Sequence, residues 1–168
     1  MRRTLLLILL IIAAQSVAQS QTESGFSHRE GLATHRCAGW QLTVKHESDD
    51  AGAGQRYVTY AFRNTSSSPC KLSGFPTFVL LNRYGHRMSG QSVTHNTDPV
   101  TTVTLAPGGK AFFNIHYSSC STVGTPPCRF SSKVRIKAPH TTRNFIRRAQ
   151  LDPFHLSVDL SPVKSTAP

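Results

Sequence analysis

Apolar and polar residues alternate along most of the chain after residue 40. Trp40, Leu42 and Val44 are separated by polar residues, and residues 56–64 repeat the pattern. Successive side chains of an extended strand point to opposite faces, so this period of two predicts strands with one buried face. The same pattern, or a short apolar run, predicts further strands at residues 77–81, 100–105, 110–117, 133–138, 143–148 and 154–160.

Turn-forming residues separate these segments, at 48–54, 64–69, 82–85 and 106–109. The turn at 106–109 predicts a hairpin between residues 100–105 and 110–117. The continuous apolar run 77–81 predicts a centre strand buried on both faces, and the polar stretch 87–98 predicts a long loop or a short edge strand. A sustained helical period is absent, so the pattern favours an all-β, antiparallel β-sandwich of about 7–9 strands.

The first residues have the features of a secretory signal peptide. Two arginines precede the apolar run 4–14, and Ser16-Val17-Ala18 supplies small residues before an expected cleavage after Ala18. This run is shorter than the ~20 residues that cross a bilayer, although an uncleaved membrane anchor is the alternative. We therefore expect a secreted, periplasmic or cell-envelope protein with a signal peptide (1–18), a flexible leader (19–36), a β-sandwich domain (37–163) and a disordered tail (164–168).

Four cysteines follow the expected cleavage site. An even number of cysteines in an exported chain predicts two disulfides, and reduced thiols are the alternative. Of the three possible pairings we favour Cys37 with Cys70 and Cys120 with Cys128. Closely spaced Cys and His pairs of the kind that bind zinc are absent from the sequence.

The chain is strongly basic, with 19 Lys and Arg against 8 Asp and Glu and a formal net charge of +11. Such a charge attracts polyanions and says nothing about the fold. If residues 133–138 and 143–148 pair, Lys133, Arg135 and Lys137 lie on one face of the pair, and Arg143 and Arg147 can lie beside them. Arg129 and Arg148 are near these five basic residues. We expect weak binding of an anionic envelope or extracellular polymer, such as acidic polysaccharide, lipid head groups or nucleic acid. The alternative is that these cations keep an exposed strand soluble.

Signals for catalysis are weak. The eight histidines show no spacing of two residues that would bring two of them together on one face of a strand, and a Gly-x-Ser-x-Gly nucleophile motif is absent. We therefore expect a non-catalytic binding or structural module without a cofactor, a metal or a catalytic residue. The alternative is a small exported enzyme or metal-binding protein whose site is assembled only in the fold.

Three motifs resemble a family of exported bacterial domains known as domain of unknown function 4232. Cys37 lies just before the first predicted strand, and Asn64-Thr65 is followed by Cys70-Lys71-Leu72-Ser73-Gly74-Phe75-Pro76, similar to the family signature Asn-Thr…Cys-x-Leu-x-Gly-aromatic-Pro. The segment from Val103 to Ala111 is similar to the family's Val-x-Leu-x-Pro-Gly-Gly-x-Ala turn. The resemblance covers Cys37 to Val163 and implies an immunoglobulin-like sandwich and an exported location, without an assigned activity.

The chain departs from the family pattern at one cysteine. Members often have a fourth cysteine near the last strand, where this chain has Leu151-Asp152-Pro153. Cys128 then corresponds to the family's third cysteine and Cys120 is additional, so the pairing of these two stays open. Asn64-Thr65-Ser66 is also a glycosylation sequon, but we interpret Asn64 as a turn residue that ends a strand.

Overall fold

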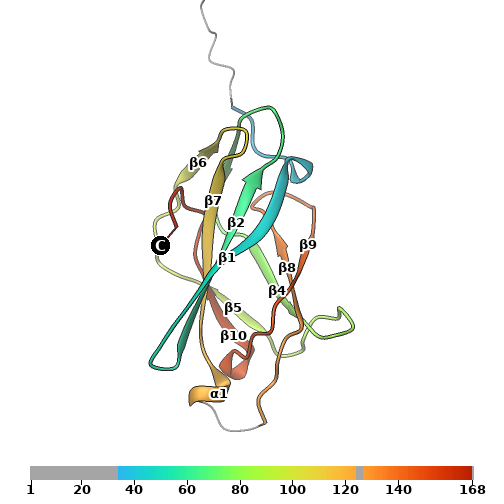
Figure 1. Ribbon diagram of the computed structural model, residues 1–168, viewed down its shortest axis with the longest axis vertical. Helices are drawn as coiled ribbons and strands as arrows, with labels where there is room; N and C mark the ends of the chain where they lie inside the picture. Colours follow the sequence, from blue (N-terminus) through green and yellow to red (C-terminus); the bar gives the residue numbers. More distant parts are fainter. Residues whose placement is uncertain (1–33, 124–126, 168) are drawn as a thin grey trace, which may run out of the picture. The chain divides into compact units, whose positions relative to one another are not determined.

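The computed structural model describes residues 34–123 and 127–167, and Figure 1 shows their arrangement. The predicted signal peptide and residues 19–33 of the predicted leader lie outside the described residues. Within these two ranges lie three short helical segments, η1 (Gly39–Gln41), α1 (Cys120–Val123) and η2 (Phe154–Leu156). The described residues form ten strands: β1 (Leu42–Gly52), β2 (Gln55–Asn64), β3 (Cys70–Ser73), β4 (Thr77–Leu81), β5 (Ser92–His95), β6 (Thr102–Leu105), β7 (Lys110–Ser118), β8 (Lys133–Lys137), β9 (Phe145–Arg148) and β10 (Ser157–Leu160).

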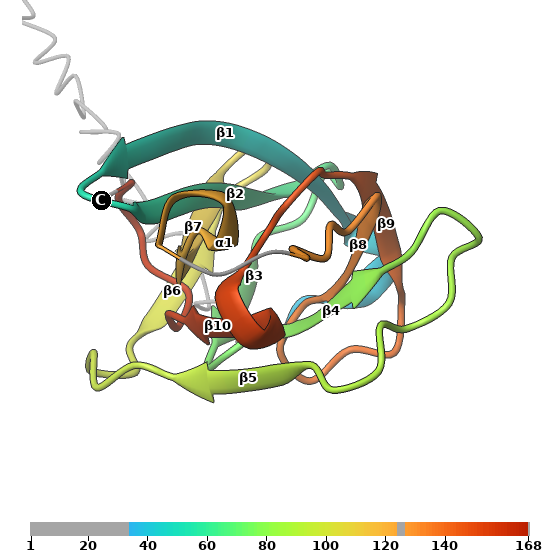
Figure 2. The same ribbon diagram turned by 90° about the horizontal axis from the view of Figure 1, so that it is seen from below.

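The strands form three sheets, in the orders β1-β2-β7-β10-β5, β3-β6 and β4-β8-β9. All pairs are antiparallel except β10 with β5. In Figure 2 the five-stranded sheet curves from β1 at the top to β5 at the bottom, with β4 and β8 at the right. The fold is the predicted antiparallel, immunoglobulin-like sandwich. It has more strands than expected because β3, four residues between Pro69 and Gly74, is too short for its alternation to be recognised.

The core lies between the sheets and is rich in aromatic rings. Phe113 stacks on Phe62 at 5.1 Å and on Tyr60 at 5.7 Å between ring centroids, and all three side chains are almost completely buried. Burying one large apolar side chain stabilises a fold by about 1.5–3 kcal/mol. Trp40, predicted to share the inward face of Leu42, is instead 69% exposed. It lies in η1, whose turn interrupts the alternation just before β1 begins.

Two predicted strand arrangements are wrong. The turn at 106–109 does not close a hairpin, because β6 pairs with β3 while β7 pairs with β2. The turn is instead hydrogen-bonded to the end of β2 through Asn64, whose backbone contacts Gly108 and Gly109 at 2.8 and 3.0 Å. In addition, β4 lies at the end of its sheet rather than in the centre, although four consecutive residues, Phe78 to Leu81, are buried, so both of its faces are covered as predicted. The segment after β4 returns along this strand, where Met88 N donates to Leu80 O at 3.0 Å.

The strand β1 is longer than the sequence predicted. It runs through most of the expected 48–54 turn, and only Ala53 and Gly54 separate it from β2. A β-bulge interrupts its register between His46 and Ser48. A bulge adds one residue to the strand and so shifts the alternation of its faces. As a result His46 and Asp49, three residues apart, both lie on the inner face, opposite Tyr60 and Val58.

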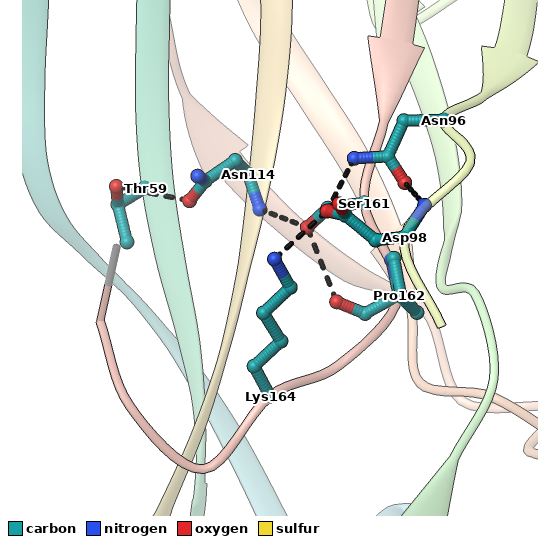
Figure 3. A network of polar contacts seen from close by, with 7 residues as sticks. All are labelled: Thr59, Asn96, Asp98, Asn114, Ser161, Pro162 and Lys164. Atoms are coloured by element: carbon teal, nitrogen blue, oxygen red, sulfur yellow. Dashed lines mark hydrogen bonds and ion pairs between the residues drawn. The ribbon is translucent and has the colours of Figure 1, made fainter. Parts of the chain in front are cut away.

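The ordered domain extends slightly beyond its predicted boundaries of residues 37 and 163, because hydrogen bonds fix the chain on both sides. Lys71 N donates to His35 O at 2.8 Å, within the predicted leader. At the other end, Lys164 exchanges two backbone hydrogen bonds of 2.8 Å with Phe112 in β7. Figure 3 shows the polar network at this end, in which Lys164 Nζ lies 2.8 Å from an Asp98 oxygen. Ser161 Oγ accepts from Asn114 N at 2.8 Å in the same network, so the C-terminal segment is held against β7.

Candidate functional site

A group of basic side chains lies on the outer face of the β4-β8-β9 sheet. Lys133, Arg135 and Lys137 alternate along β8 with Val134 and Ile136, which are completely buried. Their side chains are half-buried, so the aliphatic stems cover the sheet while the charged ends reach solvent. The register places Arg148 directly opposite Lys133 and on the same face. We call the surface formed by these four cations the basic face: Lys133, Arg135, Lys137 and Arg148.

Two predicted members do not belong to the basic face. Arg147 pairs with Val134 and therefore points to the other side of the sheet, where its Nε donates to Val44 O of β1 at 2.8 Å. Arg143 precedes β9 and lies over the Phe145 ring at 5.3 Å. The sequence predicted the strand pair correctly but not its register, and a shift of one residue reverses which side chains share a face. Arg148, expected only nearby, takes the place of Arg147.

The basic face is poor in neutralising carboxylates. Between Asp98 and Asp152 the sequence contains no acidic residue. The described residues form the ion pairs Lys110–Glu47 and Lys164–Asp98 and a contact between His46 and Asp49, none of which involves the basic face. Ile146 lies opposite Arg135 and is 53% exposed. The face therefore presents positive charge around an exposed apolar side chain.

A cleft of about 400 Å³ opens beside the basic face, between the β1–β2 hairpin and the segment that follows β9. Arg148 belongs to both surfaces. The walls combine acidic, basic, phenolic and apolar side chains: His46, Asp49, Asp50, Arg56, Val58, Tyr60, Tyr117, Arg148, Ala149, Gln150, Leu151 and Asp152. No sequence pattern predicts this site, because its residues come from strands far apart in the chain and the bulge in β1 leaves no recognisable spacing.

Buried phenols are the main feature of the cleft. Burial raises the pKa of Tyr60 above its ordinary value, and the Asp49 carboxylate raises it further. Burial also raises the pKa of Tyr117 to about 12, with a further contribution from the Asp152 carboxylate. Both hydroxyl groups therefore stay protonated at neutral pH and can donate a hydrogen bond. His46 Nε2 lies 3.0 Å from Asp49 Oδ2 at the same site.

Asp152 connects the cleft to the loop closed by the second disulfide. Its Oδ2 accepts from Ser119 Oγ at 2.8 Å and from Ser121 N at 2.9 Å. Burial would raise the pKa of this carboxyl, but the hydrogen bonds from Ser121 and Ser119 outweigh burial, so the pKa lies below its ordinary value. The charged form is therefore the one that stabilises the fold.

This shift makes a pH-dependent prediction for the variant Asp152→Asn. A carboxyl whose pKa is lowered by folding stabilises the protein above the unfolded pKa of ~4, and this contribution is lost as pH falls through the folded pKa. The variant should be about 1–2 kcal/mol less stable than the parent at pH 7, and the difference should shrink at pH 3. Urea unfolding at both pH values measures this, with the exposed Asp50→Asn as control. A difference that is the same at both pH values would contradict the assignment.

The cysteines are joined as Cys37–Cys70 and Cys120–Cys128, with Cα–Cα distances of 4.8 and 5.7 Å. These are the two pairings favoured from the sequence, and all four cysteines are bonded. Within residues 34–123 and 127–167, His, Cys, Asp and Glu do not gather in a group of three or more that could hold a metal ion. The same residues contain no helix with the length and apolar character needed to cross a membrane.

Most of the chain matches a known protein family. The family model described as "Domain of unknown function (DUF4232)" matches residues 37–162. A search of curated proteins finds no match. The matched range contains the basic face, the cleft and both disulfides.

Proposed function

The chain belongs to the family described as Domain of unknown function (DUF4232), a description that assigns no activity. From its geometry we propose that the protein is an exported, non-catalytic binding module that holds an anionic polymer of the cell envelope or exterior on its basic face. The observation that carries the proposal is the row of four cations on the β4-β8-β9 sheet, without an acidic partner in the ion pairs of the described residues.

Export is part of the proposal and is supported by the sulfur chemistry. Both disulfides link residues of the matched domain, and disulfides persist mainly in oxidising compartments outside the cytosol. The signal-peptide pattern at residues 1–18 agrees with this location.

The arrangement of the cations suits a repeating polyanion. Alternate residues of one strand lie about 6–7 Å apart, so Lys133, Arg135 and Lys137 form a line of charge that can follow a polymer with regularly spaced acid groups. The rigid strand fixes their backbone positions, and the half-buried stems restrict the side chains. Binding of this kind is electrostatic and is expected to weaken as salt rises.

The test is charge reversal of the strand β8 cations. The triple variant Lys133→Glu, Arg135→Glu, Lys137→Glu should lose retention on a sulfated polysaccharide matrix at about 50 mM salt and bind at least about tenfold more weakly, because attraction becomes repulsion. Salt-gradient elution and titration with a soluble polyanion measure the change.

A matched control separates the basic face from net charge. The variant Arg36→Glu, Lys45→Glu, Arg63→Glu changes the charge equally, at exposed positions outside the basic face, and should keep most of its retention. Arg147→Ala should also keep its retention, because Arg147 contacts Val44 on the other side of the sheet. Equal elution of the two triple variants would contradict the proposal.

A further inference from the structure

We propose that the anionic polymer is a polysaccharide and that the cleft beside the basic face receives one of its sugar units. This inference rests on the proposed function, because the cleft and the basic face share Arg148. It adds a binding site for an uncharged, hydroxyl-rich ring next to the row of cations.

The cleft has the size of a small-molecule site. Its volume of about 400 Å³ lies within the ~300–1,000 Å³ of ligand pockets. Tyr60 is held in place by its stacking on Phe113 at 5.7 Å and by the His46 ring at 5.6 Å. A wall that is already fixed loses little conformational entropy when a ligand binds.

The charges of the lining favour a neutral, hydrogen-bonding ligand. Asp49, Asp50 and Asp152 would repel a small anion, whereas Arg56 and Arg148 would repel a small cation. An apolar ligand would leave these groups without partners, which is costly. Each sugar hydroxyl both donates and accepts hydrogen bonds, so a sugar ring can use carboxylate acceptors and guanidinium donors in the same cleft.

The phenols add donors of fixed direction. Tyr60 and Tyr117 are 1% and 6% exposed, so their rings belong to the wall while both residues line the cleft. Their protonated hydroxyl groups can each donate to a ring or hydroxyl oxygen. A buried phenol also offers an apolar ring edge beside its polar tip, which suits a sugar ring with its mixed polar and apolar surface.

The surroundings of the cleft continue the binding surface. Arg148, Ala149 and Gln150 line both the cleft and a second, shallower hollow of about 530 Å³. Phe130 borders this hollow and is 47% exposed. A chain of sugar units can therefore place one unit in the cleft, pass over Arg148 and lay its acid groups on the basic face.

The experiment compares polymers of equal charge but different units. The full protein is titrated with a sugar hexamer in which glucuronic acid alternates with uncharged N-acetylglucosamine, and with inorganic polyphosphate and single-stranded DNA that carry the same number of negative charges. We expect the protein to bind the hexamer most tightly. Tyr60→Phe and Tyr117→Phe, which leave the charge of the cleft unchanged, should each weaken hexamer binding about three- to tenfold, through one lost hydrogen bond, and leave polyphosphate binding unchanged.

A matched control is Tyr57→Phe, the same chemical change on the outer face of the five-stranded sheet, where Tyr57 stacks on His116. It should bind the hexamer like the parent, and urea unfolding checks that each variant is folded. Cleft variants that bind the hexamer like the parent, or a parent that prefers DNA or polyphosphate, would overturn the polysaccharide inference while the proposed function stands. A parent that binds none of the three would overturn both.

Discussion

Replacing Cys37 and Cys70 together by alanine should lower the free energy of unfolding by about 4 kcal/mol. The bond joins residues 33 positions apart, and in the chain-entropy model the closure of a loop of this length removes ~4 kcal/mol of conformational freedom from the unfolded chain. The expected loss is a large part of the ~5–15 kcal/mol that stabilise a typical domain. The variant should therefore unfold about 10–15 °C below the parent.

The local structure explains why this bond has no substitute. Cys37 precedes β1, whereas Cys70 begins β3, and the two residues are 4% and 0% exposed. Around the bond, Cys37 N donates to Lys71 O at 2.9 Å, and Arg36 and Lys71 form an isolated parallel β-bridge. These short contacts depend on the position of the N-terminal segment, which the disulfide fixes. Without the bond, the segment before β1 can separate from β3.

The second disulfide supplies the control. Cys120 and Cys128 are only 8 positions apart, and the same model gives ~2.5 kcal/mol for their loop. Thermal and urea unfolding of the Cys37→Ala, Cys70→Ala variant and of the Cys120→Ala, Cys128→Ala variant measure both losses under one set of conditions. A larger loss for the second pair, or a loss below about 1 kcal/mol for the first, would show that loop closure does not control the stability.

The sequence predicted those properties of the fold that depend on local pattern. Alternation identified most strands, and the even cysteine count led us to favour the two disulfides that the structure shows. The family resemblance supported Cys37–Cys70 alone and left the pairing of Cys120 and Cys128 open. The predicted hairpin at 100–117 is wrong because hydrogen bonds at Asn64 hold the 106–109 turn between two sheets. Alternation alone does not tell whether neighbouring strands pair with each other or with strands of different sheets.

The candidate site was predicted only in part, for a related reason. The cations of β8 follow from alternation within one strand, but the side on which Arg147 lies depends on the register between β8 and β9. The cleft depends on contacts between segments that lie still farther apart in the sequence. It combines His46, placed by a bulge, with Asp152 after β9, and neither position has a sequence signal of its own.

Asn64→Ala should cost about 3 kcal/mol of stability. Asn64 is completely buried, and its Nδ2 donates to Ser68 O at 2.8 Å and to Leu105 O at 3.1 Å. Its Oδ1 accepts from Ser66 N at 3.0 Å and from Ser66 Oγ at 2.8 Å. Removing this side chain leaves several donors and acceptors without their partner, and each buried one costs about 1–3 kcal/mol.

The expected loss is large because one side chain connects three parts of the fold. Through Asn64 the end of β2 is bonded to the 65–69 turn and to the last residue of β6. Asn82→Ala is a matched control, since Asn82 accepts two turn hydrogen bonds at an exposed site and should cost about 1 kcal/mol. Equal losses in urea unfolding would contradict the connecting role.

The burial of Asn64 also implies that its sequon accepts no glycan in the folded protein, because both Nδ2 hydrogens are already donated.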